Sequence, residues 1–343
     1  MKSLRMRSDR SLFFQELPDA PAPKSHEVTI RMAYASICGY DMMMYRGTAA
    51  YPRGGCMGHE GSAIVEAVGS DVTELKPGDH VTILPYFPCG KCEACRAERS
   101  AYCINSGGRS DLMTERLTLD QKMCFKLPQG LSLKAGSLIE PLMMAMHAVR
   151  KAKLRYGCNV IIMGCGAMGQ IILKLVQVSQ VGKIVVVEPD EEKRKAALRF
   201  GADVVLDPSL GNVTTEALSI SGGEGFDAVI EASGNRESAQ MAMNLVARGG
   251  SVVFFGLYGM DFNLELNLFN LYWKDATVSA VCVPSGQFPD ALRIAPRLHL
   301  EEVVTAVFPF EQAVEAFEEK ATGKHAKVML AFQPEERDSN DQP

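Results

Sequence analysis

Between residues 157 and 284, short apolar stretches alternate with helical patterns, and this alternation constrains the fold more than any other feature. The predicted strands are 160–163, 184–188, 204–206, 228–231, 252–255 and 278–281. The predicted helices between them include 168–179, 191–200 and 238–247. Strands that are apolar throughout and alternate with helices form a parallel sheet covered on both faces. This half of the chain is therefore predicted to be an α/β, doubly wound domain.

The flanking segments have a different pattern. Residues 28–33, 61–69 and 80–84 read as strands separated by turns, and 141–153 reads as a helix. After the alternation stops, 310–320 forms an amphipathic helical pattern that ends before Gly323, and 327–332 reads as a last strand. That final segment is too small to fold alone. We therefore expect a β-rich domain of residues 1–147, joined by 285–343, and a second domain of 148–284, with a disordered tail after Gln333.

A glycine-rich loop follows the first strand of the alternating region. It reads Gly164-Cys-Gly166-Ala-Met-Gly169, and it precedes a predicted helix that opens at Ala167 and Met168. In this context the first glycine permits a tight turn, the second lets the backbone approach a pyrophosphate, and the third allows close helix–sheet packing. The helix N-terminus offers N–H groups to the phosphates. The sequence therefore predicts a dinucleotide site.

The residues after the next strand bear on the choice of dinucleotide. Glu188 ends that strand about 20 residues after the last glycine, where a carboxylate binds a ribose 2′-hydroxyl. The same carboxylate repels a 2′-phosphate, so NAD is favoured over NADP. Lys193 and Arg194 lie close enough in sequence to weaken that preference. A solvated acid at a strand end is the alternative interpretation of Glu188.

Four cysteines are clustered in the β-rich segment, at Cys89, Cys92, Cys95 and Cys103. Tight C-x-x-C turns bring thiolates to one point, as a tetrahedral zinc ion requires. The pattern predicts a structural zinc site. Reduced, unmetallated thiols are the alternative.

Composition limits the class of protein. The chain has 343 residues, 47% of them hydrophobic and 22% charged, with a formal net charge of −5. This balance is typical of a globular protein and disfavours a nucleic-acid surface. We find neither a signal peptide nor an apolar run of membrane-spanning length. Ten cysteines in a chain of this length fit the reducing cytoplasm, where clustered thiols favour a metal over disulfides.

Five motifs in order give the chain a family resemblance. They are Cys38-Gly-Tyr-Asp41, Gly58-His59-Glu60, the four-cysteine loop, Glu140-Pro-Leu142 and the glycine-rich loop. Together they resemble the zinc-dependent medium-chain alcohol dehydrogenases, most closely the sorbitol (polyol) dehydrogenase branch, from about Val28 to Phe332. The resemblance implies a GroES-like catalytic domain split around a Rossmann domain, and homodimers or homotetramers.

The resemblance also implies a catalytic zinc site. It assigns a second zinc to Cys38 and His59, with Glu60 or Glu140 alongside. One thiolate, one imidazole and one carboxylate leave a fourth position for water or substrate, which is the ligand set of a catalytic zinc. A core cysteine and a structural histidine are the alternatives at Cys38 and His59. The stretches that contain Gly256, Leu257 and Cys282 align with cofactor-contacting segments of the family.

Some residues depart from the family pattern. Tyr40 stands where the family usually has Ser or Thr, Met43 replaces a common His, and Val283 stands where sorbitol dehydrogenases carry Arg. The Tyr40 phenol could relay a proton or bind the substrate, and it could also be merely packed. Residues 42–44 are all Met and could line an apolar pocket or belong to the core.

These observations predict an oxidoreductase that transfers a hydride between a secondary alcohol and NAD, giving a ketone. The expected substrate is a small molecule: a polyol, sugar or cyclitol. A dehydrogenase of an amino alcohol or diol is the alternative within the enzymes. A catalytically dead nucleotide-binding protein is the alternative outside them.

Overall fold

The computed structural model describes residues 1–282 and 287–332, and the chain divides into two compact units. One unit comprises residues 1–141 with 285–343, and the other comprises residues 142–284. The boundary expected from the sequence, between residues 147 and 148, lies inside helix α4 (Ile139–Lys151). Val283 and the tail after Gln333 lie outside the described residues. Within the described ranges, no helix is both long and apolar enough to cross a bilayer.

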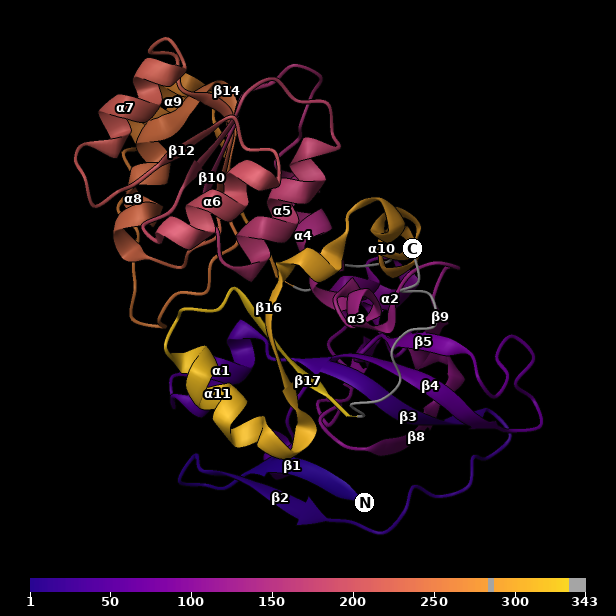
Figure 1. The fold of residues 1–343 in the computed structure, drawn as a ribbon. Helices are drawn as coiled ribbons and strands as arrows, with labels where there is room; N and C mark the ends of the chain where they lie inside the picture. The colour runs from indigo at the N-terminus through magenta and orange to yellow at the C-terminus, as the bar shows by residue number, and fades with distance from the viewer. Residues whose placement is uncertain (283–286, 333–343) are drawn as a thin grey trace. The chain divides into compact units, whose positions relative to one another are not determined.

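The unit of residues 142–284 contains a six-stranded parallel sheet, which confirms the predicted α/β architecture (Figure 1). Its strands are β10 (Val160–Met163), β11 (Ile184–Val187), β12 (Val204–Leu206), β13 (Phe226–Glu231), β14 (Val246–Phe254) and β15 (Thr277–Ala280). Its helices are α5 (Ala167–Gln177), α6 (Glu191–Arg199), α7 (Val213–Ile220), α8 (Arg236–Leu245) and α9 (Leu268–Lys274). The sequence pattern did not identify α7 and α9. Every residue of β10 is fully buried, as its uninterrupted apolar sequence requires.

The order of the strands determines where this unit can bind a ligand. The order is β12-β11-β10-β13-β14-β15, so the chain moves outward from β10 to one edge and then returns to β13 on the other side. Ligands of doubly wound sheets bind at such a switch point, outside the carboxyl ends of the strands. The loops that follow β10 and β13 are therefore the expected place for a dinucleotide.

The other unit is built around a seven-stranded sheet, in agreement with the predicted β-rich domain. Its strands are β3 (Glu27–Ser36), β4 (Glu60–Val68), β5 (His80–Ile83), β8 (Arg116–Asp120), β9 (Cys124–Lys126), β16 (Val304–Pro309) and β17 (Lys327–Ala331). Smaller strands form two ribbons, β1 (Lys2–Met6) with β2 (Leu12–Glu16), and β6 (Tyr86–Phe87) with β7 (Gly107–Gly108). The helices are α1 (Gly39–Tyr45), α2 (Glu93–Arg96), α3 (Leu133–Gly136), α10 (Phe288–Ile294) and α11 (Ala313–Ala321).

The C-terminal segment does return to this sheet, as expected. Strand β17 pairs antiparallel with β3, with Met329 opposite Ser36, and β16 extends the sheet beyond β17. Figure 1 shows the yellow strands β16 and β17 next to the indigo β3. Segments that are far apart in the sequence, 27–36 and 327–331, thus pair in one sheet.

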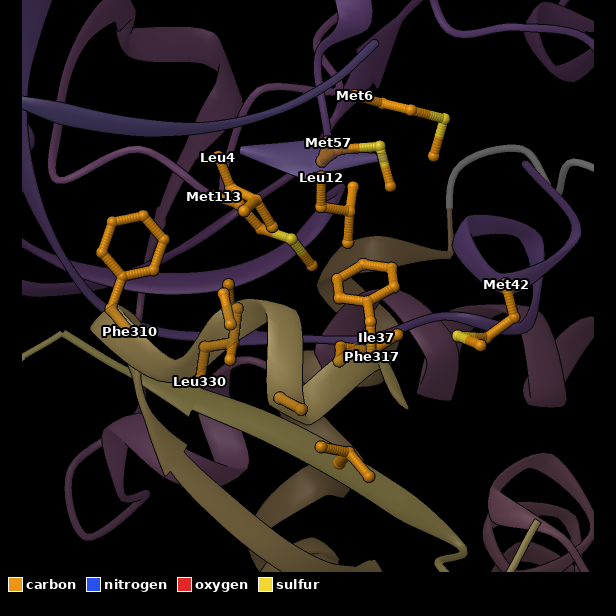
Figure 2. Close-up of a cluster of buried hydrophobic side chains, with 14 of the residues drawn as sticks. Leu4, Met6, Leu12, Ile37, Met42, Met57, Met113, Phe310, Phe317 and Leu330 are labelled. Carbon is orange, nitrogen blue, oxygen red and sulfur yellow. The ribbon is translucent and has the colours of Figure 1, made fainter. Parts of the chain in front are cut away.

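A methionine-rich core lies beside the turn between β3 and α1. Ile37 and Met42 pack in one cluster with Met57, Phe317 and Leu330, and Figure 2 shows these side chains from both ends of the chain. Met44 belongs to the same buried cluster. Met42 and Met44 are therefore core residues rather than pocket-lining ones. By burying Ile37 just before Cys38 and Met42 on the helix that Cys38 caps, this core fixes the position of that cysteine.

Candidate functional site: two thiolate clusters and a dinucleotide loop

The four cysteines predicted to bind zinc converge in the structure. The Sγ atoms of Cys89, Cys92, Cys95 and Cys103 all lie within 4.8 Å of one another. The Sγ–Sγ distances are 3.5 Å for Cys92–Cys95, 3.8 Å for Cys92–Cys103 and 4.0 Å for Cys89–Cys95. Zn–S bonds of about 2.3 Å in a tetrahedron give sulfur–sulfur edges of ~3.8 Å. The observed distances lie on either side of that value, so the cluster fits a zinc ion.

Backbone groups of the loop favour thiolate at one of these cysteines. The amides of Lys91 and Cys92 each donate to the Cys89 Sγ at 3.4 Å. These hydrogen bonds lower the pKa of Cys89 to about 6, whereas burial raises the pKa of Cys95 to about 12. Cys89 is therefore the thiol of this pair that is already deprotonated, and ready to bind a metal, at neutral pH.

A second group that could hold a metal consists of Cys38, His59 and Glu60, whose ligand atoms lie within 4.8 Å of one another. Strand pairing brings these residues together, because Ser36 at the end of β3 lies opposite Glu60 at the start of β4. Cys38 follows β3 by two residues and is the N-cap of α1. The antiparallel register thus places a thiol, an imidazole and a carboxylate from distant segments at one point.

Asp41 holds this group in place and was not among the predicted site residues. Its Oδ2 accepts a hydrogen bond from the Cys38 amide at 2.9 Å, and its Oδ1 lies 3.5 Å from His59 Nδ1. Burial disfavours a charged imidazole, but the carboxylate of Asp41 and the Cys38 sulfur outweigh it and raise the pKa of His59 well above its ordinary value. A carboxylate at Nδ1 orients the ring and leaves Nε2 for a metal.

Glu60 lies between a buried cation and the candidate metal position. Its Oε2 contacts Lys327 Nζ and accepts a hydrogen bond from Ser36 Oγ. Its Oε1 is buried and has no hydrogen-bond partner among the described residues. An unpartnered buried carboxylate oxygen is costly unless a cation satisfies it. This oxygen is the observation that best fits a metal ion next to Cys38 and His59.

Two predicted residues lie outside that group of three ligands. Glu140, in the first turn of α4, is buried, and burial raises its pKa to about 7. The structure does not include its carboxylate in the set of converging ligand atoms. Tyr40 is 44% exposed, and its backbone amide donates to the Cys38 Sγ at 3.5 Å. Its phenol thus belongs to a surface side chain beside the group rather than to the core.

The glycine-rich loop connects β10 to α5 and has the geometry that the motif requires. Gly164 has a φ of +95°, and a Cβ there would lie 2.8 Å from Ser233. A Cβ on Gly169 would lie 2.0 Å from the Gly164 carbonyl oxygen. At Gly166, the N-cap of α5, a Cβ would meet nothing within 4 Å, which leaves room for a ligand. Ala167 and Met168 form the first turn of this helix.

Other groups of the protein hold the Glu188 carboxylate and the basic side chains near it. The buried Glu188 carboxylate accepts hydrogen bonds from the Cys165 amide at 2.7 Å and the Asp190 amide at 3.0 Å. Arg194 donates to the Glu188 carbonyl at 2.8 Å and pairs with Asp207 at 2.9 Å. Lys193 Nζ lies 4.0 Å from Asp190. The guanidinium of Arg194 is thus already paired with a carboxylate.

The remaining predicted cofactor residues follow the last two strands of the parallel sheet. Gly256 and Leu257 come directly after β14, and Leu257 is exposed. Cys282 follows β15 and is also exposed. These positions lie on loops at the carboxyl edge of the sheet, together with the loops after β10 and β13.

Sequence reasoning missed Asp41 and Lys327 as parts of the buried group. Both left a signal in the sequence. Asp41 stands three residues after the N-cap Cys38, which is the spacing of a capping box. Lys327 is the one charged residue of the strand Lys327–Ala331, whose other members are apolar. A charged side chain at the start of a buried strand indicates a buried partner of opposite charge.

The chain was compared with known proteins and structures. The family model "Alcohol dehydrogenase GroES-like domain" matches residues 24–129, and the model "Zinc-binding dehydrogenase" matches residues 167–297. The probable D-xylulose reductase A of Emericella nidulans is 30% identical over 340 residues, which cover 91% of this chain and 92% of the relative. D-xylulose reductase A of Aspergillus niger is 27% identical over 334 residues, or 93% of each chain. A crystal structure described as a zinc-binding dehydrogenase from Clostridium scindens has 30% identity and a TM-score of 0.91, and covers 97% of this chain and 99% of its own.

Proposed function

The chain belongs to the zinc-dependent medium-chain alcohol dehydrogenases, and from this premise we propose that it oxidises a polyol, sugar or cyclitol at a secondary alcohol, with NAD as the hydride acceptor. The reaction converts the alcohol and NAD⁺ to a ketone, NADH and a proton, and it can run in reverse. The observation that carries this proposal is the convergence of Cys38, His59 and Glu60, with an unpartnered Glu60 oxygen. D-xylulose reductases among the relatives support a sugar-derived substrate.

We assign each residue of the buried group a role. Cys38, His59 and Glu60 hold the catalytic zinc, which polarises the alcohol oxygen and lowers its pKa when bound. Asp41 orients His59, and Lys327 offsets the negative charge of Glu60. Glu140 is a second carboxylate available to the metal, because it lies close enough to change the charge balance of His59 and Glu60.

Tyr40 is our candidate for moving the proton that leaves the alcohol. Its side chain is partly exposed and follows Cys38 by two residues, so it can connect the site to solvent. An unperturbed phenol has a pKa of about 10, so Tyr40 would act as a neutral donor and acceptor in a relay. Tyr40→Phe would remove the relay and keep the ring.

The second unit supplies the dinucleotide site. Gly164, Gly166 and Gly169 form the pyrophosphate loop, and α5 presents its N-terminus there through Ala167 and Met168. Glu188 binds the adenosine ribose, and Gly256, Leu257, Lys193 and Cys282 are further contacts. We expect NAD to be preferred over NADP, because Glu188 repels a 2′-phosphate and Arg194 is paired with Asp207. Measurement of kcat/KM with both cofactors tests this preference.

Cys89, Cys92, Cys95 and Cys103 are proposed to bind the structural zinc. A cytoplasmic location agrees with the free thiols of all ten cysteines.

We also propose that the protein forms a homodimer or homotetramer. Strand β15 is the last strand of the six-stranded sheet, and Thr277, Val278 and Ala280 on it are exposed. Helix α9 exposes Phe269, Tyr272 and Trp273 by 69%, 80% and 60%. An exposed edge strand beside exposed aromatic rings is typical of an interface. Light scattering after size exclusion would give the mass, and Trp273→Lys is expected to lower it.

A substrate panel tests the proposed reaction. The purified protein should contain two zinc ions per chain and produce NADH from polyols or cyclitols faster than from simple secondary alcohols or diols. Preference for an amino alcohol or diol would move the assignment to that class. One zinc per chain, NADH binding and no turnover with any alcohol would favour a dead nucleotide-binding protein, which the substitutions at Tyr40 and Met43 keep as the second candidate.

A further inference from the structure

A buried carboxylate lies at the switch point of the parallel sheet, and the proposed reaction does not use it. Glu231 is the last residue of β13 and is fully buried. A buried carboxylate is costly unless hydrogen bonds compensate for its lost solvation. The hydrogen-bond donors around Glu231 therefore indicate which segments this carboxylate holds together.

The donors to Glu231 come from the loop after β13, from helix α8 and from the loop after β14. From the loop after β13, the Ser233 amide donates to Oε1 at 3.0 Å and the Gly234 amide donates to Oε2 at 3.3 Å. The hydroxyls of Ser233 and Ser238 also donate to Oε1. From the loop after β14, the Tyr258 hydroxyl donates to Oε2. Tyr258 is thus the side chain that ties the β14 loop to this carboxylate.

These loops are tightly packed, because their glycines lie directly against backbone atoms of the neighbouring loop. A Cβ on Gly234 would lie 2.5 Å from the Leu257 carbonyl oxygen, and a Cβ on Gly256 would lie 2.3 Å from the Gly234 amide nitrogen. A Cβ on Gly164 would lie 2.8 Å from Ser233, as described above. The glycine-rich loop, the β13 loop and the β14 loop therefore form one packed layer, with Glu231 at its centre.

Two neighbouring aromatic rings also hold the Tyr258 ring in place for this contact. Its ring centroid lies 5.3 Å from that of Phe262 and 6.3 Å from that of Phe254. Burial and the Glu231 carboxylate raise the pKa of Tyr258, so its hydroxyl remains a donor. The ring stays in place even when the hydroxyl is removed, so the two contributions can be separated by mutation.

We propose that Tyr258 is a positioning residue for the dinucleotide. Through Glu231 its hydroxyl holds Gly256 and Leu257 in one conformation against Gly234 of the β13 loop, before the cofactor arrives. Preorganisation of a binding loop removes the cost of ordering it on binding. This inference rests on the proposed function, because Gly256 and Leu257 are cofactor contacts only in a dinucleotide enzyme.

The test compares Tyr258→Phe with Tyr156→Phe, which removes the hydroxyl of a tyrosine that is 85% exposed in the same unit. The dissociation constant for NADH is measured by fluorescence on the zinc-loaded protein without substrate. We expect Tyr258→Phe to weaken NADH binding by about tenfold, the usual effect of losing one hydrogen bond to a charged group. Tyr156→Phe should leave the dissociation constant for NADH unchanged. The kcat of Tyr258→Phe at saturating NAD should stay within about twofold of the wild-type value.

A merely structural role makes a different prediction. It would lower the melting temperature of Tyr258→Phe while the dissociation constant for NADH stays at the wild-type value, and that result would overturn the proposal. Ser238→Ala removes another donor to Glu231 that does not come from the β14 loop, so it should leave NADH binding intact. An equal loss of affinity in Ser238→Ala would also overturn the role of Tyr258.

Hydrogen exchange of residues 255–262 gives a second measurement that needs no unstable variant. We expect these amides in the wild-type protein to be protected without NADH and to change little when NADH binds. Amides that exchange freely until NADH is added would contradict preorganisation. If the wild-type protein binds no NADH at all, the proposed function is wrong. If the wild-type protein binds NADH and Tyr258→Phe binds it equally well, only the inference about Tyr258 is wrong.

Discussion

The two candidate metal sites of the β-rich unit differ in how they are assembled. The four cysteines lie within residues 89–103, and backbone amides of their own loop donate to Cys89. Cys38 and the adjacent pair His59 and Glu60 come from two segments, and a third segment supplies Lys327. Asp41, on the helix that Cys38 caps, adds a further buried charge. A local loop suffices to hold a metal, but a reactive site needs the fold to supply its charges and to leave one metal position open.

The largest expected effect separates the roles of the two clusters. His59→Ala removes an imidazole ligand, and kcat/KM should fall by about 10³-fold, because metal polarisation contributes several kcal/mol to the transition state. Zinc content should drop from two ions per chain to one. His26→Ala, at an exposed position paired with Asp71, is the matched control. Retention of alcohol oxidation by His59→Ala would refute the catalytic site.

Cys92→Ser tests the other cluster and should mainly affect stability. Loss of the structural zinc removes free energy of folding, and we expect the chain to unfold about 3 kcal/mol more easily. Zinc content should again be one ion per chain, but the remaining ion should still support turnover below the melting temperature. Calorimetry, metal analysis and kinetics would measure these effects, with Cys56→Ser, which belongs to neither metal site, as control. A Cys92→Ser protein that is stable but fully inactive would mean that the two sites do not have separate structural and catalytic roles.

Asp41→Asn tests whether the buried charges belong to the reactive site. The amide keeps a hydrogen-bond acceptor for the Cys38 backbone but loses the negative charge that faces His59. Removing such a partner of a ligand lowers metal affinity or activity by about 10- to 100-fold. Kinetics at several zinc concentrations would show this loss. Asp9→Asn, on the exposed β1–β2 turn, should be neutral; equal kinetics for the two variants would leave Asp41 with a capping role only.

The smallest expected effect is a pH dependence of the four-cysteine loop. The pKa of Cys89 is lowered from 9.0 to about 6, so the contribution of its thiolate to folding is complete above pH 9 and is lost as pH falls through 6. Below pH 6 a proton also competes with the metal for its sulfur. Zinc affinity should therefore fall by about one additional tenfold step per pH unit below 6. Competition with a coloured chelator between pH 5 and 8 would measure it. A slope that stays constant through pH 6 would disagree with the loop geometry.

The two clusters also show how far the sequence predicts this protein. Periodicity and motif spacing identified the parallel sheet, the glycine-rich loop, the four cysteines and the return of 327–332 to the first unit. Helices α7 and α9 were missed because short helices of mixed composition carry little periodicity. The Met run was ambiguous, since an apolar helical stripe does not reveal which residues face it, and Met42 and Met44 lie in the core.

The buried charges could not be paired from the sequence for a related reason. Lys327 and Glu60 are far apart in sequence, and only the pairing of β17 with β3 and of β3 with β4 brings them together. Likewise, Glu231 and Tyr258 meet because parallel strands end at a common edge. Such contacts depend on register, which a single sequence does not give residue by residue.

The position of Lys327 on the last strand has a consequence for synthesis of the protein. A ribosome makes Cys38, His59 and Glu60 well before Lys327, the lysine on β17 that balances Glu60. Until β17 joins β3, the nascent reactive centre carries an uncompensated acid and cannot settle into its finished arrangement. Messages that end before the codons of β17 should therefore yield chains that never mature into working enzyme.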